Sequence, residues 1–166
     1  GNNYQHKDLF MKIELGSITT AEFRDGIRHL TRQPLTDEQI DAAWIAMLDD
    51  VPDYKLDLLL DLRKRYNTML LSNTNEIHWD WSEKTCFSYK GHHASDFFNH
   101  IYLSYRLHML KPDADIFEYV LQNAGIRPEE TLFIDDAVPN CRTAESLGFH
   151  TYTPQPREDW SHLFVN

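Results

Sequence analysis

Basic residues are scarce in this sequence. Sixteen lysines and arginines stand against 26 aspartates and glutamates in 166 residues, giving a formal charge of −10. A protein that binds the backbone of nucleic acids needs a basic face, so this balance argues against a nucleic-acid partner. A small anionic substrate remains compatible with it, because one lysine and a metal ion reverse the field locally within a cleft.

Cysteine is scarce as well, and long apolar runs are absent. Cys86 and Cys141 are isolated and lack metal-ligand spacing, which favours two free thiols in a reducing cytoplasm, with one disulfide as the alternative. No uncharged apolar run is long enough to cross a bilayer, so we expect no membrane partner. No charged-then-apolar leader opens the sequence, which leaves secretion without support and favours the cytoplasm.

What the sequence does contain is enough for one globular domain, with or without a small appendage. Its hydrophobic share of 42% and length of 166 residues allow a single well-buried core. The sequence carries no internal repeat and no low-complexity linker. Nothing in it indicates the oligomeric state.

The first fifty or so residues predict helices only. Leu9, Phe10 and Ile13 recur at helical spacing, and residues 19–22 and 36–39 both match the capping-box pattern that opens a helix. Small amphipathic helices of this kind bury their apolar faces against each other or against a neighbour.

From residue 56 onward the pattern alternates between helices and short apolar strands. We expect helices over residues 56–65, 77–81, 112–121 and 144–147, and strands over residues 68–71, 101–104, 131–134 and 150–153. Alternation of this kind calls for right-handed crossovers and a parallel sheet. The sequence therefore predicts an α/β domain with a helical N-terminal segment.

Two adjacent carboxylates, Asp135 and Asp136, follow the strand predicted over residues 131–134. Acids at the end of a buried strand lie at the carboxyl edge of the sheet, where open α/β folds place their ligands. Their mutual repulsion calls for a cation, and Mg²⁺ typically binds one or two protein carboxylates together with phosphate and water. The alternative is an acidic turn after a strand.

Two further strand ends carry polar residues that suit an anion. Ser72 and Asn73 follow one strand, and Lys111 comes shortly after another. The Ser72 hydroxyl and nearby backbone N–H groups suit a phosphoryl oxygen, and Lys111 supplies a point charge. Each residue alone reads more simply as a turn or a solvated lysine. In a parallel sheet, however, such positions gather along one edge, so we expect them to meet the two acids in a single cleft.

Three segments in this order resemble motifs of one family. The segments are LLSNTN at 70–75, LKPDADIF at 110–117 and FIDDAVPN at 133–140. They look like the second, third and fourth motifs of the haloacid dehalogenase-like (HAD) hydrolase superfamily, in the branch of sugar-phosphate phosphatases and epoxide hydrolase N-terminal phosphatase domains. The resemblance covers roughly residues 56–155 and implies a Rossmann-like parallel sheet flanked by helices over 55–166, with a small helical cap over 1–54.

The resemblance also implies roles for the matched residues. Ser72, helped by Asn73, would bind the transferring phosphoryl group, and Lys111 would offset charge on that group and on the nucleophile. Asp136 would be the Mg²⁺ ligand, with Asp135 a second ligand or an outer-shell partner.

Asn140 matches a position that often holds an acid supporting the metal shell, so an amide there gives weaker support.

The family's first motif has no counterpart here. Members begin with a strand ending in Asp-x-Asp or Asp-x-Gly, whose first Asp attacks phosphorus, whereas Asp8 and Asp25 lie within helical patterns. We therefore expect the nucleophile upstream of this sequence, in a Mg²⁺-dependent phosphatase acting on a small phosphorylated metabolite through an aspartyl-phosphate. The chain alone would then be nearly inactive. The alternatives are a non-catalytic phosphate-binding or regulatory module and a hydrolase of the haloacid dehalogenase type.

Overall fold

The structure, a computed structural model, describes residues 2–164, and the side chains from Asp8 onward. Gly1, Val165 and Asn166 lie outside the described residues. Contacts divide the chain into two compact units, Gly1–His108 and Met109–Asn166. The predicted boundary between a cap over 1–54 and a core over 55–166 is a different division and stays a prediction.

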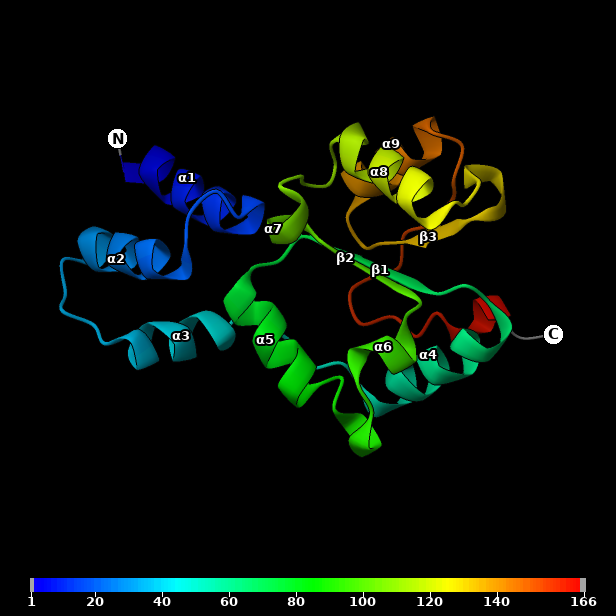
Figure 1. Ribbon diagram of the computed structural model, residues 1–166, viewed down its shortest axis with the longest axis horizontal. Coiled ribbons are helices and arrows are strands. Elements are labelled where there is room, and N and C mark those ends of the chain that lie inside the picture. The colour runs from blue at the N-terminus through cyan, green and yellow to red at the C-terminus, as the bar shows by residue number, and fades with distance from the viewer. Residues whose placement is uncertain (1, 165–166) are drawn as a thin grey trace. The chain divides into compact units, whose positions relative to one another are not determined.

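The first unit is mainly helical and contains one pair of strands (Figure 1). Its elements are α1 (Asn2–Leu15), α2 (Thr20–Thr31), α3 (Asp37–Ile45), α4 (Asp53–Arg65), β1 (Met69–Ser72), α5 (Glu76–Thr85), η1 (Tyr89–Gly91), α6 (Ala94–Phe97), β2 (His100–Leu103) and α7 (Ser104–Leu107).

Both predicted capping boxes are confirmed. The Thr19 and Thr36 side chains each accept a hydrogen bond from the backbone of the third helical residue, whose own side chain accepts from the cap backbone in return. These boxes satisfy N–H groups that the first turn of a helix otherwise leaves without partners. The helices pack through an aromatic cluster in which Phe23 is fully buried and Trp44 stacks on Phe10 with ring centroids 5.2 Å apart.

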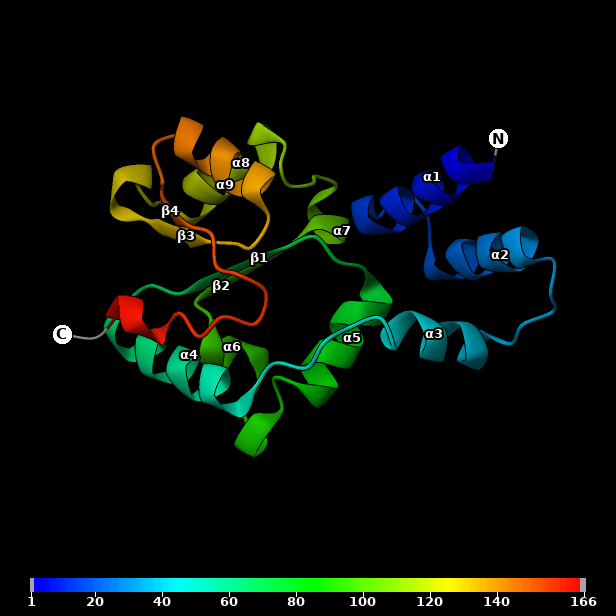
Figure 2. The same ribbon diagram turned by 180° about the vertical axis from the view of Figure 1, so that it is seen from behind.

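The strands β1 and β2 run parallel and lie side by side (Figure 1 and Figure 2). Their register places Ser72 opposite Leu103 at the carboxyl ends of the two strands. A second apolar cluster, which includes Leu56 of α4, Phe97 of α6 and Leu103 of β2, packs these elements together.

The second unit holds the other pair of parallel strands (Figure 1). Its elements are α8 (Ala114–Ala124), η2 (Pro128–Glu130), β3 (Leu132–Ile134), α9 (Val138–Ser146), β4 (His150–Tyr152) and η3 (Ser161–Phe164). In both Figure 1 and Figure 2, α8 and α9 lie on the same side of the β3–β4 pair. Edge-to-face contacts among Phe117, Phe133 and Phe149 join α8 to this sheet.

The α/β class with parallel strands and flanking helices is confirmed, and three details differ from expectation. The described strands form two two-stranded sheets rather than a single sheet, because no strand within residues 2–164 pairs with members of both sheets. Ser72 is the last residue of β1, and Ser104 begins α7 instead of ending β2.

The expected helix start at Pro112 is also wrong. Pro112 lies in a turn that the Asp113 N–H closes by donating to the Leu110 carbonyl at 3.0 Å, so α8 begins two residues later at Ala114. Asp113 occupies the N-cap position, where aspartate is among the preferred residues.

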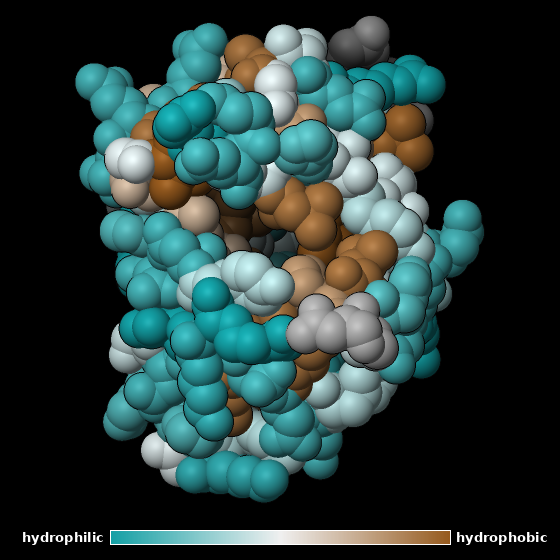
Figure 3. Space-filling view, turned by 90° about the vertical axis from the view of Figure 1, so that its right-hand side faces the viewer, coloured by the Kyte–Doolittle hydropathy of each residue, from teal (hydrophilic) through white to brown (hydrophobic). Residues whose placement is uncertain are grey.

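The exterior fits the composition. Hydrophilic residues cover most of the face shown in Figure 3, and hydrophobic residues gather there in smaller patches. Cys86 and Cys141 are both free and buried, which confirms the expected free thiols. Within residues 2–164, no helix combines the length and the apolar character needed to cross a membrane.

We predict that Thr19→Ala lowers the free energy of unfolding by about 1 kcal/mol, because the first turn of α2 loses its side-chain acceptor. Urea unfolding of both proteins measures this difference. The matched control is Thr31→Ala at the other end of α2, where an exposed hydroxyl donates to the Ile27 carbonyl. An equal loss in both variants would contradict a specific role for the cap.

Candidate active site

The two acids identified from the sequence lie where strand β3 ends. The last strand residue, Ile134, pairs with Tyr152 of β4, and the Asp135 N–H donates to the Tyr152 carbonyl at 3.2 Å. Helix α9 begins at Val138, so Asp135 and Asp136 occupy the short connection between a strand and a helix. Pairing with β4 thus fixes the backbone of Asp135.

Three donors surround the Asp135 carboxylate. Lys111 Nζ donates to Oδ2 at 2.7 Å, Asn140 Nδ2 donates to the same oxygen at 3.1 Å, and the Ala137 N–H donates to Oδ1 at 2.8 Å. The side chains of Lys111 and Asp135 are only 10% and 9% exposed. This is a largely buried ion pair with additional hydrogen bonds, the arrangement that a desolvated carboxylate requires.

Opposing effects act on the pKa of Asp135. Burial alone would raise this pKa, but the hydrogen bond and charge of Lys111 act against it, together with the Ala137 N–H and the Asn140 amide. The donors prevail, and the pKa of Asp135 lies below its usual value. Asp135 is therefore ionised at neutral pH and held in one orientation.

Asp136 has the opposite environment. Its residue is exposed, and within residues 2–164 its carboxylate makes no hydrogen bond or ion pair. A carboxylate supplies the hard oxygen ligands that Mg²⁺ prefers, and Mg²⁺ needs few protein ligands when substrate and water complete its coordination shell. Within the described part of the chain, no group of three or more His, Cys, Asp and Glu side chains could hold a metal ion. The Mg²⁺ site expected at the acid pair therefore stays a prediction, in which substrate and water would supply most of the ligands.

Ser72 and Asn73 belong to the first unit and are both half-buried at the carboxyl end of β1. The loop that follows them is held by the next two residues. The Thr74 N–H donates to Ser104 Oγ at 2.9 Å, and Asn75 Oδ1 accepts from the His78 N–H at 3.0 Å, capping α5.

The structure brings together Lys111, Asp135 and Asn140, which the sequence places up to 29 residues apart. Ser72 and Asn73 lie in the other unit, so the expectation that they share a cleft with the acids stays a prediction. Sequence reasoning missed the Ala137 N–H and the Ser104 hydroxyl. Neither carries a pattern in the sequence, because each acts through contacts that only the fold creates.

The family model for haloacid dehalogenase-like hydrolases matches residues 3–148. The chain belongs to this family of hydrolases. Membership confirms the resemblance that the three motifs indicated.

One curated relative and two solved structures match this HAD hydrolase over nearly its whole length. It is 36% identical over 159 residues to the D-ribitol-5-phosphate phosphatase of Bacteroides thetaiotaomicron, spanning 96% of this chain and 77% of that protein. A crystal structure of a HAD family enzyme from the same organism has a TM-score of 0.97 at 52% identity, covering 99% of this chain and 81% of that one. The same enzyme in complex with magnesium and inorganic phosphate has a TM-score of 0.93 at 54% identity, covering 95% and 79%.

We predict that Lys111→Met lowers the free energy of unfolding of this hydrolase by about 3 kcal/mol at pH 7, because Asp135 would stay buried without its cation. The pKa of Asp135 is depressed in the native state. The pair therefore stabilises the fold above the unfolded-state pKa of about 4, and this stabilisation is lost as the pH falls through the native pKa. Urea titrations between neutral and acid pH should show the difference between variant and parent shrinking.

Lys84→Met provides the matched control. Lys84 Nζ lies 2.9 Å from Asp80 Oδ2, but those side chains are 73% and 61% exposed, so we expect a change below about 0.5 kcal/mol. A difference for Lys111→Met that does not depend on pH would show that the lost stability does not come from the ion pair.

Proposed function

We propose that the protein is a Mg²⁺-dependent phosphatase acting on a small phosphorylated metabolite. The observation that carries this proposal is the contrast within the Asp135–Asp136 pair. Asp135 is ionised and held by Lys111 and Asn140, whereas Asp136 is exposed without a partner among the described residues. One carboxylate is fixed, and the next is available for a ligand.

In this proposal Asp136 is the direct metal ligand. Asp135 supports it as a second ligand or from the outer shell, and Asn140 keeps Asp135 oriented. A bound Mg²⁺ would supply charge neutralisation at the phosphoryl oxygens. Support comes from the relative solved with magnesium and inorganic phosphate at 54% identity.

Ser72 and Lys111 are the proposed contacts of the phosphoryl group. The Ser72 hydroxyl, at the carboxyl end of β1, donates a hydrogen bond to a phosphoryl oxygen, and Asn73 assists it. Lys111 carries a positive charge that Asp135 holds in place, and this fixed charge favours the negative charge that builds up during transfer.

The proposed nucleophile is a carboxylate from a strand upstream of Gly1. Its oxygen attacks phosphorus while the bond from phosphorus to the substrate oxygen breaks, and the substrate leaves as an alcohol once that oxygen takes up a proton from solvent. Water then hydrolyses the acyl phosphate, which releases phosphate and restores the carboxylate. Two observations support this origin. β1 pairs only with β2 and β3 only with β4 among the described strands, so each sheet has an edge that another strand could join. An aspartate-to-alanine mutant of the relative, altered near the start of its own chain, was solved with magnesium and inorganic phosphate.

Two curated relatives support the substrate class that we propose. The D-ribitol-5-phosphate phosphatase matches over 96% of this chain, whereas a sesquiterpene phosphatase from Aspergillus oryzae matches 58% of it at 35% identity. A phosphorylated sugar alcohol is therefore the substrate class we propose, with a terpenyl phosphate as the comparison substrate.

We predict that Asp136→Asn, in protein extended by its upstream segment, lowers Mg²⁺-dependent release of phosphate from ribitol 5-phosphate by at least about 100-fold. The amide removes the charge that the metal requires, and because Asp136 is exposed, the fold should be unaffected. Phosphate release measured with and without EDTA, together with the thermal unfolding midpoint, gives both readouts.

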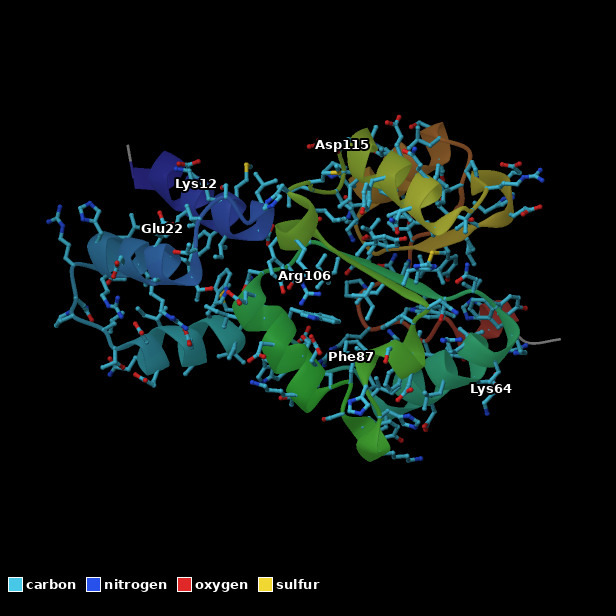
Figure 4. The ribbon with its side chains drawn as sticks, viewed as in Figure 1. Lys12, Glu22, Lys64, Phe87, Arg106 and Asp115 are labelled. Carbon is cyan, nitrogen blue, oxygen red and sulfur yellow. The ribbon has the colours of Figure 1, made fainter. Side chains whose placement is uncertain are left out.

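Asp115→Asn is the matched control, because Asp115 is also exposed and points outward from the first turn of α8 (Figure 4). We expect its activity to stay within about twofold of the parent, because among the described residues no hydrogen bond or ion pair joins the exposed Asp115 side chain to Asp135 or Asp136. Full activity in Asp136→Asn would contradict the proposed role of Asp136 as the metal ligand.

A further inference from the structure

A fully buried hydroxyl lies at the junction of three segments of the first unit. Ser104 directly follows Leu103, the residue of β2 that pairs with Ser72. Ser104 is 0% exposed. A buried hydroxyl needs partners to offset its desolvation. Its partners in this structure come from a loop and a helix that lie far from it in the sequence.

One of these partners is the loop after Ser72. Ser104 Oγ accepts a hydrogen bond from the Thr74 N–H at 2.9 Å and lies 3.0 Å from the Thr74 carbonyl. The next residue, Asn75, is also 0% exposed, and its Oδ1 accepts from the indole N–H of Trp44 at 3.1 Å. The loop that follows Ser72 is therefore anchored at two successive residues, Thr74 and Asn75.

The other partner is the end of helix α1. Ser104 Oγ donates to the Glu14 carbonyl at 2.7 Å, and His108 Nδ1 lies 2.8 Å from the Leu15 carbonyl. Both contacts satisfy carbonyls that a helix C-terminus leaves without intrahelical partners. The approach is close, because a Cβ at Gly16 would lie 2.0 Å from the Tyr105 carbonyl oxygen.

A hydroxyl has one proton and here has two carbonyl acceptors. The hydroxyl donates to the Glu14 carbonyl, which is the nearer of the two, and the Thr74 carbonyl remains within reach as a second acceptor. A shift of α1 would thus leave the hydroxyl with a partner, and the Thr74 N–H would still have its acceptor. His108 contacts α1 in the same way, but no hydrogen bond joins it to the loop among the described residues.

We propose that Ser104 is a positioning residue for phosphoryl binding. It holds the Asn73–Asn75 loop, and through that loop the Ser72 hydroxyl, in the geometry that the phosphoryl group requires. It also joins this loop to α1, so that the helical segment and the phosphoryl-binding strand end share one anchor. This inference rests on the role proposed for Ser72 in the phosphatase.

The test compares Ser104→Ala with His108→Ala in protein that includes the upstream segment. Both variants remove a cap from α1, but only the first removes the acceptor of the Thr74 N–H. We expect Ser104→Ala to raise the KM for ribitol 5-phosphate and the inhibition constant of inorganic phosphate about tenfold, the effect of one lost buried hydrogen bond. Amide hydrogen exchange at Thr74 should also accelerate. For His108→Ala we expect changes within about twofold in all three measurements.

Equal effects of the two variants, or unchanged exchange at Thr74 in Ser104→Ala, would overturn the inference. If the alanine variant does not fold, Ser104→Cys takes its place, and its weak thiol should shift KM and exchange in the same direction by a smaller factor. An inactive parent protein would reject the phosphatase proposal, whereas hydrogen exchange would still decide whether Ser104 holds the loop.

Discussion

The arrangement of the acid pair depends on the ion pair between Lys111 and Asp135. Both side chains are largely buried, so each would destabilise the fold without the other. The ion pair joins the turn before α8 to the end of β3, and the Ala137 N–H and Asn140 amide extend the contact to the start of α9. One buried carboxylate thus connects three segments of the second unit, and this requirement explains why Lys111, Asp135 and Asn140 lie together.

Much of the fold was predictable because its signals are local. Two capping boxes marked the starts of α2 and α3, and the four strands expected from the sequence agree with the strands described in residues 2–164 to within about one residue at each end. The error at Pro112 has a local cause too. Proline suits the first turn of a helix and also suits a turn, and only the hydrogen bond from Asp113 to Leu110 decides between them.

The site was less predictable because its contacts are not local. The order of the motifs pointed to Ser72, Lys111 and the acid pair, but not to the way each is held. The Ser104 hydroxyl contacts a carbonyl 90 residues earlier and an amide 30 residues earlier. No spacing rule links such positions, since a serine after a strand has the same appearance whether it faces solvent or a buried carbonyl. Burial decides its role, and burial is a property of the folded chain.

Asp135 and Asp136 show how environment separates the roles of identical residues. As adjacent aspartates they have the same chemistry in the sequence, and either could ligate a metal. The fold gives Asp135 a cation, an amide and a backbone donor, which hold its pKa below its usual value and occupy both of its oxygens. Asp136 is exposed and keeps its oxygens available among the described residues. A carboxylate whose oxygens are already held by donors serves to orient the site, whereas a carboxylate with unoccupied oxygens can bind a metal ion. The direct metal role proposed here therefore falls to Asp136.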